Sequence, residues 1–407
     1  MREPKSVFPD RELTDKERKN FSILDTVRKK GPVAKTDISK LTGLNIVTVS
    51  NYIDSYIKKD LVTEEGFDSS SGGRKPMMVN LNQKSAYVIG LGVGMVDIIG
   101  VVTDLRCGII AQVKKKKPPK TGKSIIKILI DIVDELILQL GDQKDKIKGI
   151  GLGVAGILDK ENRTIKCPGP LGTPDEVISV SMWDEFAKKF GIPLLIENDT
   201  DCAVFGEQWL TLNPEYKHVI YMYSGVACGI MINGQVYTGA SGCAGELGIM
   251  NPNALDSYDC KSYGYGLGRW SIELGILDDI EGLQRKNKDS KIFGLVNNRI
   301  SDIGFHTIAE AARDGDELAS GLLDKAAQDL GKKIAFLVNL FNPQVVVIGG
   351  GVERAGSSFI TKIKETIKEW SFEEASRVLK VIPAQLAENA VPLGAASLVI
   401  RNYFEGM

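Results

Sequence analysis

Residues 193–207 read PLLIENDTDCAVFGE, an apolar run that ends in polar side chains and then continues as a helical pattern. The apolar run predicts a buried strand, closed by Glu197, Asn198 and Asp199. Side chains at the carboxyl end of such a strand indicate a ligand site. A carboxylate and an amide there can hold adjacent hydroxyl groups of a polyol, and a carboxylate can also act as a general base. Alternatively, Asn198 or Asp199 caps the following helix, and the two roles are compatible.

Strands and helices alternate on both sides of this stretch. Residues 87–112 predict two or three strands rich in Val and Ile, and residues 122–140 and 179–190 predict helices. Residues 218–239 repeat the strand-rich opening, with glycines in the turns. The pattern predicts an α/β fold of two similar lobes with a cleft between them, where ligands usually bind.

Two glycine-rich turns add candidate residues. Glu246 lies in SGCAGELG, either as part of a site or as a surface glutamate that begins a turn. Gly349, Gly350 and Gly351 follow the buried run QVVVI and form a loop whose N–H groups can receive a phosphate or an adenosine. A strand-to-helix turn also needs glycine, so this loop alone is ambiguous. The lysine run 114–117 favours a solvated strand end over a DNA-binding patch.

The N-terminal region predicts a helix-turn-helix. Residues 16–29 and 46–59 have helical periodicity, a short helix begins near residue 35, and Gly43 supplies the turn. The third helix exposes short polar side chains suited to phosphate and base-edge contacts, namely Asn45, Thr48, Ser50, Asn51 and Ser55. Residues 64–81 predict a β-wing whose tip carries Arg74 and Lys75, and a narrow A·T-rich minor groove attracts such a guanidinium. The alternative is a three-helix protein-interaction module with a solvated loop.

Composition limits the classes of protein. The 407 residues carry 51 basic and 52 acidic side chains, which excludes binding of nucleic acid through bulk charge but not through a local surface. Six scattered cysteines, the lack of a signal peptide and the lack of a membrane span predict a reduced cytoplasmic protein. Two histidines exclude a histidine-cluster mechanism. We expect a DNA-binding domain over 1–80 and lobes over 81–205 and 206–407, with a last helix near 391–405 returning to the first lobe.

Several long segments, in order, resemble the ROK family of repressors and sugar kinases, and in particular its xylose-repressor-like branch. They are GGRKP at 72–76, the stretch at 193–207, TGASGCAGELG at 238–248, the run 310–352 and LGAASL at 393–398. The resemblance implies a winged helix followed by a two-lobed, actin-like ATPase (ribonuclease H-like) fold with sugar between the lobes. It puts Asn198, Asp199, Glu246 and Glu273 on the sugar, with Asp199 at the base position of the family's kinases, here vestigial.

Two departures from the family argue against enzyme chemistry. The kinases' Asp-x-Gly-x-Thr loop is replaced by GVGMV at 92–96, which has no carboxylate or hydroxyl group to act with a metal-bound phosphate. The family's zinc ligands are reduced to Cys260, with Ile249 in the histidine position, so we expect no zinc and no other cofactor, ATP and magnesium included. The remaining loop glycines are Gly92, Gly94, Gly225, Gly229, Gly349, Gly350 and Gly351.

These observations predict a sugar-responsive transcriptional repressor without kinase activity. Its partners would be an A·T-rich, two-fold symmetric operator and a small sugar or sugar phosphate, bound by a homodimer or tetramer. One alternative is an ATP-dependent sugar kinase, of the glucokinase or N-acetylglucosamine or N-acetylmannosamine kinase type, with a DNA-binding appendage. Another is a DNA-binding protein whose effector lobes no longer bind a ligand. The sequence identifies neither the sugar nor the direction of its effect.

Overall fold

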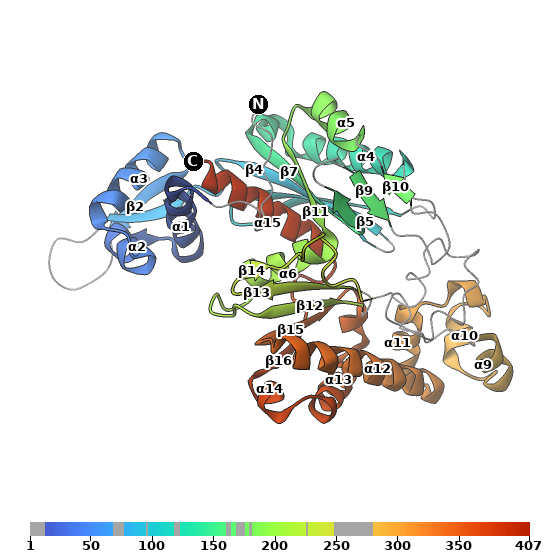
Figure 1. The fold of residues 1–407 in the computed structure, drawn as a ribbon. Helices are drawn as coiled ribbons and strands as arrows, with labels where there is room; N and C mark the ends of the chain where they lie inside the picture. The colour runs from blue at the N-terminus through green and yellow to red at the C-terminus, as the bar shows by residue number, and fades with distance from the viewer. Residues whose placement is uncertain are drawn as a thin grey trace.

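The computed structural model describes residues 13–67, 77–94, 97–117, 123–159, 164–167, 176–178, 181–224, 227–247 and 280–407. Several residues named above lie outside these ranges, namely Arg74, Lys75, Gly225, Ile249, Cys260 and Glu273. Figure 1 shows a small N-terminal unit beside two larger parts, each built on a sheet. No helix among the described residues is both long enough and apolar enough to cross a membrane.

The N-terminal unit packs three helices against a three-stranded antiparallel sheet. Its elements are α1 (Asp15–Lys30), α2 (Lys35–Thr42), α3 (Ile46–Lys58), β1 (Val33–Ala34), β2 (Val62–Phe67) and β3 (Met77–Leu81), with strand order β1-β3-β2. Thr14 and Glu17 form a capping box that begins α1. Gly43 ends α2 in the left-handed region at φ +71°, which turns the chain into α3. The helices lie close to the ranges expected from the sequence.

The first lobe has a mixed five-stranded sheet of order β11-β7-β4-β5-β6. Its strands are β4 (Tyr87–Val93), β5 (Asp97–Asp104), β6 (Ile109–Lys116), β7 (Ile147–Val154) and β11 (Leu194–Asn198). β4, β7 and β11 are parallel, whereas β5 and β6 continue the sheet as antiparallel strands. The apolar sides of α4 (Lys123–Leu140) and α5 (Ser181–Phe190) share a core with this sheet. After β7 the chain adds a small sheet of β8 (Ile157–Asp159), β9 (Thr164–Cys167) and β10 (Glu176–Ile178).

The second lobe repeats this topology. Its sheet has the order β14-β13-β12-β15-β16, formed by β12 (Val219–Tyr223), β13 (Ala227–Ile232), β14 (Gln235–Val236), β15 (Val345–Gly349) and β16 (Lys380–Pro383). As in the first lobe, two antiparallel neighbours lie on one side of the first strand and two parallel strands on the other. Among the described residues, the helices of this lobe after β14 are α9 (Ile280–Lys286), α10 (Lys291–Leu295), α11 (Phe305–Arg313), α12 (Glu317–Phe341), α13 (Ser357–Trp370) and α14 (Glu373–Val378). The fold is therefore a mixed α/β fold with a duplicated sheet.

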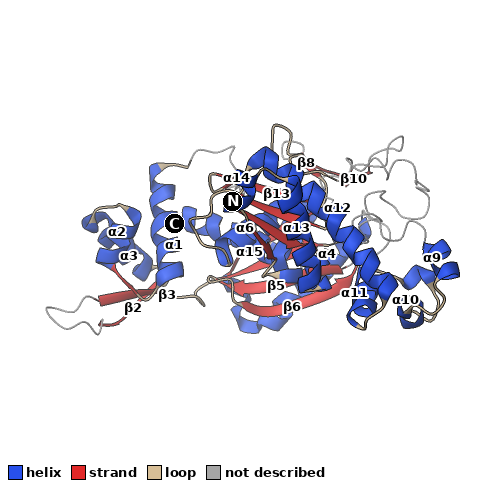
Figure 2. Cartoon of the chain, turned by 90° about the horizontal axis from the view of Figure 1, so that it is seen from below, coloured by secondary structure: helices blue, strands red, loops and turns tan. Residues whose placement is uncertain are grey.

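Two buried helices lie between the sheets and tie the parts together. α15 (Ala390–Glu405) packs on β4, where a Cβ on Gly90 would lie 2.0 Å from the Pro392 carbonyl oxygen. α6 (Asp199–Leu210) crosses α15 so closely that a Cβ on Gly394 would lie 1.9 Å from the Cys202 carbonyl oxygen. Only glycine permits this approach of two backbones. The boundary expected at residue 205 falls inside α6. Figure 1 shows α15 running from the N-terminal unit to the space between the lobes, and Figure 2 places that unit and α9–α10 at opposite ends of the molecule.

Candidate functional site

The candidate site begins where three parallel strands of the first sheet end. Val93 of β4 and Asn198 of β11 both pair with Val154 of β7, so the three strands end at one level. The residues after these strands therefore share one edge of the sheet. Asn198 and Asp199 stand at this edge, at the beginning of α6.

The Asn198 side chain caps α6, which was the alternative to a ligand role that the sequence offered. Its Oδ1 accepts hydrogen bonds from the Thr200 backbone N (2.9 Å) and Oγ1 (2.8 Å) and from the Asp201 N (3.3 Å). Its Nδ2 donates to the Gly156 carbonyl oxygen at 3.3 Å. Since an amide nitrogen carries two hydrogens, one donor of Asn198 is left for a ligand.

A tight glycine turn brings Glu246 to the same place. Gly245 has φ +87°, and a Cβ there would lie 1.9 Å from the Cys228 carbonyl oxygen. The Cys228 N donates to the Gly245 carbonyl oxygen at 2.8 Å, and Glu246 forms a bridge with Ala227. The strand that carries these contacts, β13, also touches α6, because a Cβ on Gly229 would lie 2.1 Å from the Thr200 carbonyl oxygen.

Both carboxyl groups are buried, and the charge of Asp199 acts on Glu246. Burial raises the pKa of Asp199 to about 6, against hydrogen bonds from backbone N–H groups and the charge of Lys117. Burial and then the charge of Asp199 raise the pKa of Glu246 to about 7. Burial, together with the charges of Asp201 and Glu246, raises the pKa of the Cys228 thiol to about 12. Two adjacent carboxyl groups that lose protons near neutral pH are typical of a functional site, and as carboxylates they accept hydrogen bonds from hydroxyl groups.

A separate cavity of about 840 Å³ lies between the lobes. The first lobe contributes Gly92 and Gly94, and the second contributes Tyr223, Ser224, Gly350 and Gly351. The other two described glycines of the expected nucleotide loops do not line it. Gly229 lies against Thr200, and a Cβ on Gly349 would lie 2.1 Å from the Tyr221 hydroxyl oxygen, so close packing accounts for both.

Ion pairs cross this cavity. Lys114 of β6 lies 3.2 Å from Asp97 and 2.8 Å from Glu388, measured from its Nζ to a carboxylate oxygen. Glu388 belongs to the short helix η5 (Ala387–Asn389) and lies 3.2 Å from Arg354 of η4 (Val352–Ala355) in the second lobe. Lys116 lies 3.1 Å from the other oxygen of Asp97. The lysine run thus forms the exposed end of β6 and pairs with carboxylates.

The described carboxylates that line this cavity are engaged by other groups of the protein. Residues 92–94 carry no carboxylate, and cations hold Asp97 and Glu388. Glu353 accepts a hydrogen bond from the Gly351 N at 2.8 Å, in the loop a phosphate would need. Within the described ranges, no three His, Cys, Asp or Glu side chains lie close enough together to hold a metal ion.

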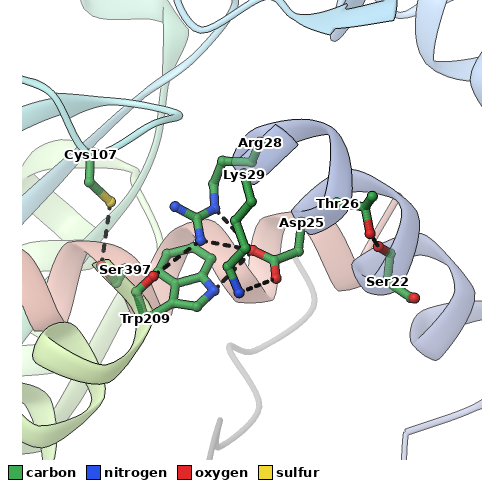
Figure 3. A network of polar contacts seen from close by, with 8 residues as sticks. All are labelled: Ser22, Asp25, Thr26, Arg28, Lys29, Cys107, Trp209 and Ser397. Carbon is green, nitrogen blue, oxygen red and sulfur yellow. Dashed lines mark hydrogen bonds and ion pairs between the residues drawn. The ribbon is translucent and has the colours of Figure 1, made fainter. Parts of the chain in front are cut away.

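The far end of α6 contacts the N-terminal unit through Trp209, as Figure 3 shows. The indole Nε1 of Trp209 donates to Asp25 Oδ1 at 3.0 Å. The Arg28 guanidinium lies 3.8 Å above the centre of the Trp209 ring and donates to the same Asp25 oxygen at 2.9 and 3.0 Å. Trp209 and Arg28 are 6% and 7% exposed. Sequence reasoning missed this joint of Asp25, Arg28 and Trp209, because no local pattern relates a helix end to residues 184 positions away.

The C-terminal helix provides a second contact with the same unit. Asn20 of α1 donates through Nδ2 to the Glu405 carbonyl oxygen at 3.2 Å and accepts from the Tyr56 hydroxyl group at 2.7 Å. Burial raises the pKa of Tyr56, which stays protonated as a donor. Lys59 donates to the Met407 carbonyl oxygen at 3.0 Å. Both helices between the lobes therefore end on the N-terminal unit.

The five described residues expected to contact DNA have different surroundings. Asn45 caps α3, with its Oδ1 accepting from the Thr48 N at 2.8 Å. Asn51 and Ser55 are exposed, whereas Thr48 and Ser50 are half-buried. All five lie on or next to α3, whose inner side is held by Val49, Ile53 and Tyr56.

Comparisons with known proteins agree with this architecture. The model of the ROK family matches residues 88–402. The xylose repressor of Caldicellulosiruptor bescii is 30% identical over 383 residues, which cover 93% of this chain and 94% of that protein. The xylose repressor of Bacillus subtilis is 26% identical, over 94% of this chain and 95% of that protein. The DNA-binding transcriptional dual regulator NagC of Escherichia coli is 22% identical, over 93% of this chain and 91% of that protein.

Two solved structures share the fold. One is a ROK family transcriptional regulator described as a homologue of the E. coli MLC protein, with a TM-score of 0.76 and 22% identity over 96% of this chain and 97% of that chain. The other is a ROK family glucokinase from Streptomyces griseus, solved with glucose and AMPPNP, with a TM-score of 0.63 and 25% identity over 77% of this chain and 99% of that chain. The resemblance found in the sequence is confirmed, and the chain belongs to the ROK family.

Proposed function

We propose that this chain is a sugar-responsive transcriptional repressor. Two relatives of similar length are named as xylose repressors and a third as a DNA-binding transcriptional dual regulator, and each matches more than nine-tenths of the chain. One structural observation carries the proposal: α6 begins at the carboxyl pair of Asp199 and Glu246 and ends on the N-terminal unit through Trp209. A ligand site and a DNA-binding unit are thereby joined by one buried helix.

The carboxyl pair is the sugar-binding element. Glu246 lies close enough to Asp199 for the charge of Asp199 to raise its pKa, and as carboxylates both accept hydrogen bonds from neighbouring hydroxyl groups of a sugar. The free amide hydrogen of Asn198 adds a donor, and Glu273 is the fourth expected ligand. Xylose is the first sugar to test, because two relatives are named after it, and a sugar phosphate is the second class.

Helix α6 carries the response. Trp209 lies ten residues after Asp199, so at 1.5 Å per residue the helix spans about 15 Å from Asp199 to the joint. A sugar that shifts the first turn of α6 also shifts Trp209, and with it Asp25 and Arg28 on α1. The sugar changes DNA affinity only if its own affinity for the chain differs between the two positions that the N-terminal unit can take.

The N-terminal unit acts as a winged helix on DNA. In this proposal residues 1–80 bind an A·T-rich operator, with α3 in the major groove and the wing residues Arg74 and Lys75 in the minor groove. The two effector lobes follow residue 80, with α6 crossing the boundary expected at residue 205 and α15 packing back on the first lobe. The working form is a cytoplasmic homodimer or tetramer, since two units are needed for a two-fold symmetric operator.

We infer that the chain does not transfer phosphate from ATP. Phosphoryl transfer depends on metal ions and positioned donors that neutralise the moving group. Of the described carboxylates that line the cleft, Asp97 and Glu388 are held by Lys114, Lys116 and Arg354, and Glu353 accepts a hydrogen bond from the Gly351 N. Without phosphoryl transfer, Asp199 has no reaction in which to act as a general base.

Thermal unfolding of the full chain with a panel of sugars tests the function. Xylose, glucose and N-acetylglucosamine are added without ATP, and one of them should raise the Tm by an amount that grows with its concentration. Asp199→Asn should lose this rise. Asp142→Asn, an exposed carboxylate before β7 at the other edge of the sheet, should keep it. A Tm indifferent to every sugar would favour a DNA-binding protein with inactive effector lobes, and sugar phosphorylation with ATP would favour the kinase.

A further inference from the structure

The outward side of α3 carries an apolar residue at its exposed beginning. Val49, Ile53 and Tyr56 are buried and define the inner side of the helix. Val47 and Asn51 lie on the opposite side, because residues four positions apart share a face of a helix. Val47 is 66% exposed, more than Ile46 beside it at 41%. A large apolar side chain thus stands free on the helix expected to enter DNA.

Most polar residues around Val47 are half-buried or engaged in other contacts. Asn45 lies one position before the helix, and its Oδ1 accepts a hydrogen bond from the Thr48 N at 2.8 Å. Ser50 is half-buried. Asp54, the acidic residue on the same side, pairs with Lys35 through an Nζ–Oδ1 distance of 2.9 Å, which reduces its repulsion of phosphates. Val47 and Asn51 are therefore the exposed side chains on this side of the first two turns of α3.

We propose that Val47 reads the C5 methyl group of thymine in the major groove and that Asn51, one turn later, contacts the adjacent adenine. The proposal rests on the proposed function of the N-terminal unit as a DNA-binding domain. The major groove is where a thymine methyl is accessible, and recognition helices touch base edges with their N-terminal residues. Asparagine can bond adenine N6 and N7 with both groups of its amide. Together they specify an A·T step, in addition to any reading of the minor groove by the wing.

The proposal predicts discrimination against cytosine. Cytosine lacks the methyl group and presents its N4 amine in the major groove, which Val47 cannot accept. Uracil differs from thymine by the methyl alone, so replacing thymine with deoxyuridine isolates the contact. Removing one buried methyl costs about 0.8 kcal/mol, which is about fourfold in affinity.

The test is a deoxyuridine scan of a DNA fragment from the chain's own upstream region, trimmed to the footprint of the full-length protein. Each thymine is replaced singly, and binding is measured by fluorescence anisotropy for wild type, Val47→Ala and Val47→Ser. Wild type should lose about fourfold in affinity at one thymine of a half-site, and both variants should lose less than about 1.5-fold there. Val378→Ala is the matched control, since it makes the same change at a residue that is 56% exposed on α14. It should keep the wild-type profile.

A second base analogue tests Asn51. Replacing the adenine next to that thymine with 7-deazaadenine removes N7, and the wild-type loss should vanish in Asn51→Ala. Specific binding with the same deoxyuridine profile in wild type and both Val47 variants would overturn the methyl contact while leaving the proposed function intact. Failure of the wild-type chain to bind any part of the fragment specifically would overturn the proposed function, and the methyl contact with it.

Discussion

Replacing Trp209 should uncouple sugar binding from the change in DNA affinity. Trp209→Phe keeps a ring that can stack on Phe205, whose centroid lies 5.6 Å away, but it removes the donor to Asp25. A hydrogen bond to a charged group contributes about 1.5–3 kcal/mol. Asp25 keeps its ion pairs with Arg28 at 2.9 Å and Lys29 at 2.8 Å, so we expect the low end of that range. A loss of about 1.5 kcal/mol corresponds to about tenfold in the population of the docked arrangement.

Trp209→Ala is the larger change. It also removes the stacking with Phe205 and the cation–π contact with Arg28, and truncation of a buried Trp costs about 3–5 kcal/mol. Coupling between two sites is typically about 1–3 kcal/mol, so this loss exceeds the whole of it. The two variants should therefore form a graded series, in which Phe weakens the effect of sugar on DNA binding and Ala abolishes it.

The assay is the ratio of DNA affinities with and without saturating sugar, measured by fluorescence anisotropy on the full chain. Sugar affinity, measured by calorimetry, should stay close to wild type because Asp199 lies at the other end of α6. Trp370→Phe makes the same change at an exposed tryptophan of the second lobe and should keep the wild-type ratio. A wild-type ratio in both Trp209 variants would refute the joint as the route of the response.

Further predictions concern the carboxyl pair and its turn. Calorimetry of Glu246→Gln should show sugar affinity lowered about tenfold or more, with DNA affinity unchanged, because a hydrogen bond to a charged acceptor is lost. Wild-type sugar affinity should rise between pH 6 and pH 8 as Asp199 and Glu246, with pKa values of about 6 and about 7, lose their protons. Because folding raises the pKa values of both groups, the free energy of unfolding measured with urea should fall as the pH rises from about 4.5 through 7. This fall should be smaller in Glu246→Gln. Gly245→Ala should abolish sugar binding, whereas Gly315→Ala, with a similar φ of +83° but open space around it, should only lower the Tm.

Much of the fold could be predicted from local sequence patterns. Helical periodicity and Gly43 gave the three N-terminal helices, since apolar spacing and a left-handed turn are properties of neighbouring residues. The strand ending at Asn198 and the helix after it were predicted for the same reason, and so was the capping role of Asn198.

The rest depended on contacts between distant residues. Glu246 could be brought to Asp199 only by the packing of Gly229 on α6, and the joint at Trp209 unites residues far apart in the chain. Glycines were ambiguous, because a phosphate loop and a close backbone contact require the same residue, as Gly229 and Gly349 illustrate. Val47 was overlooked since apolar residues of a helix are assumed to face the core, and its direction is clear only once Val49 and Ile53 are seen to be buried.

The central claim is that a sugar bound at Asp199 and Glu246 changes the DNA affinity of the N-terminal unit. The most direct measurement is the affinity of the full chain for its own upstream DNA, titrated with xylose and other sugars in the absence of ATP. The account predicts that one sugar changes this affinity at least about fivefold and that Asp199→Asn does not respond. Tight, specific DNA binding that no sugar alters would contradict the account.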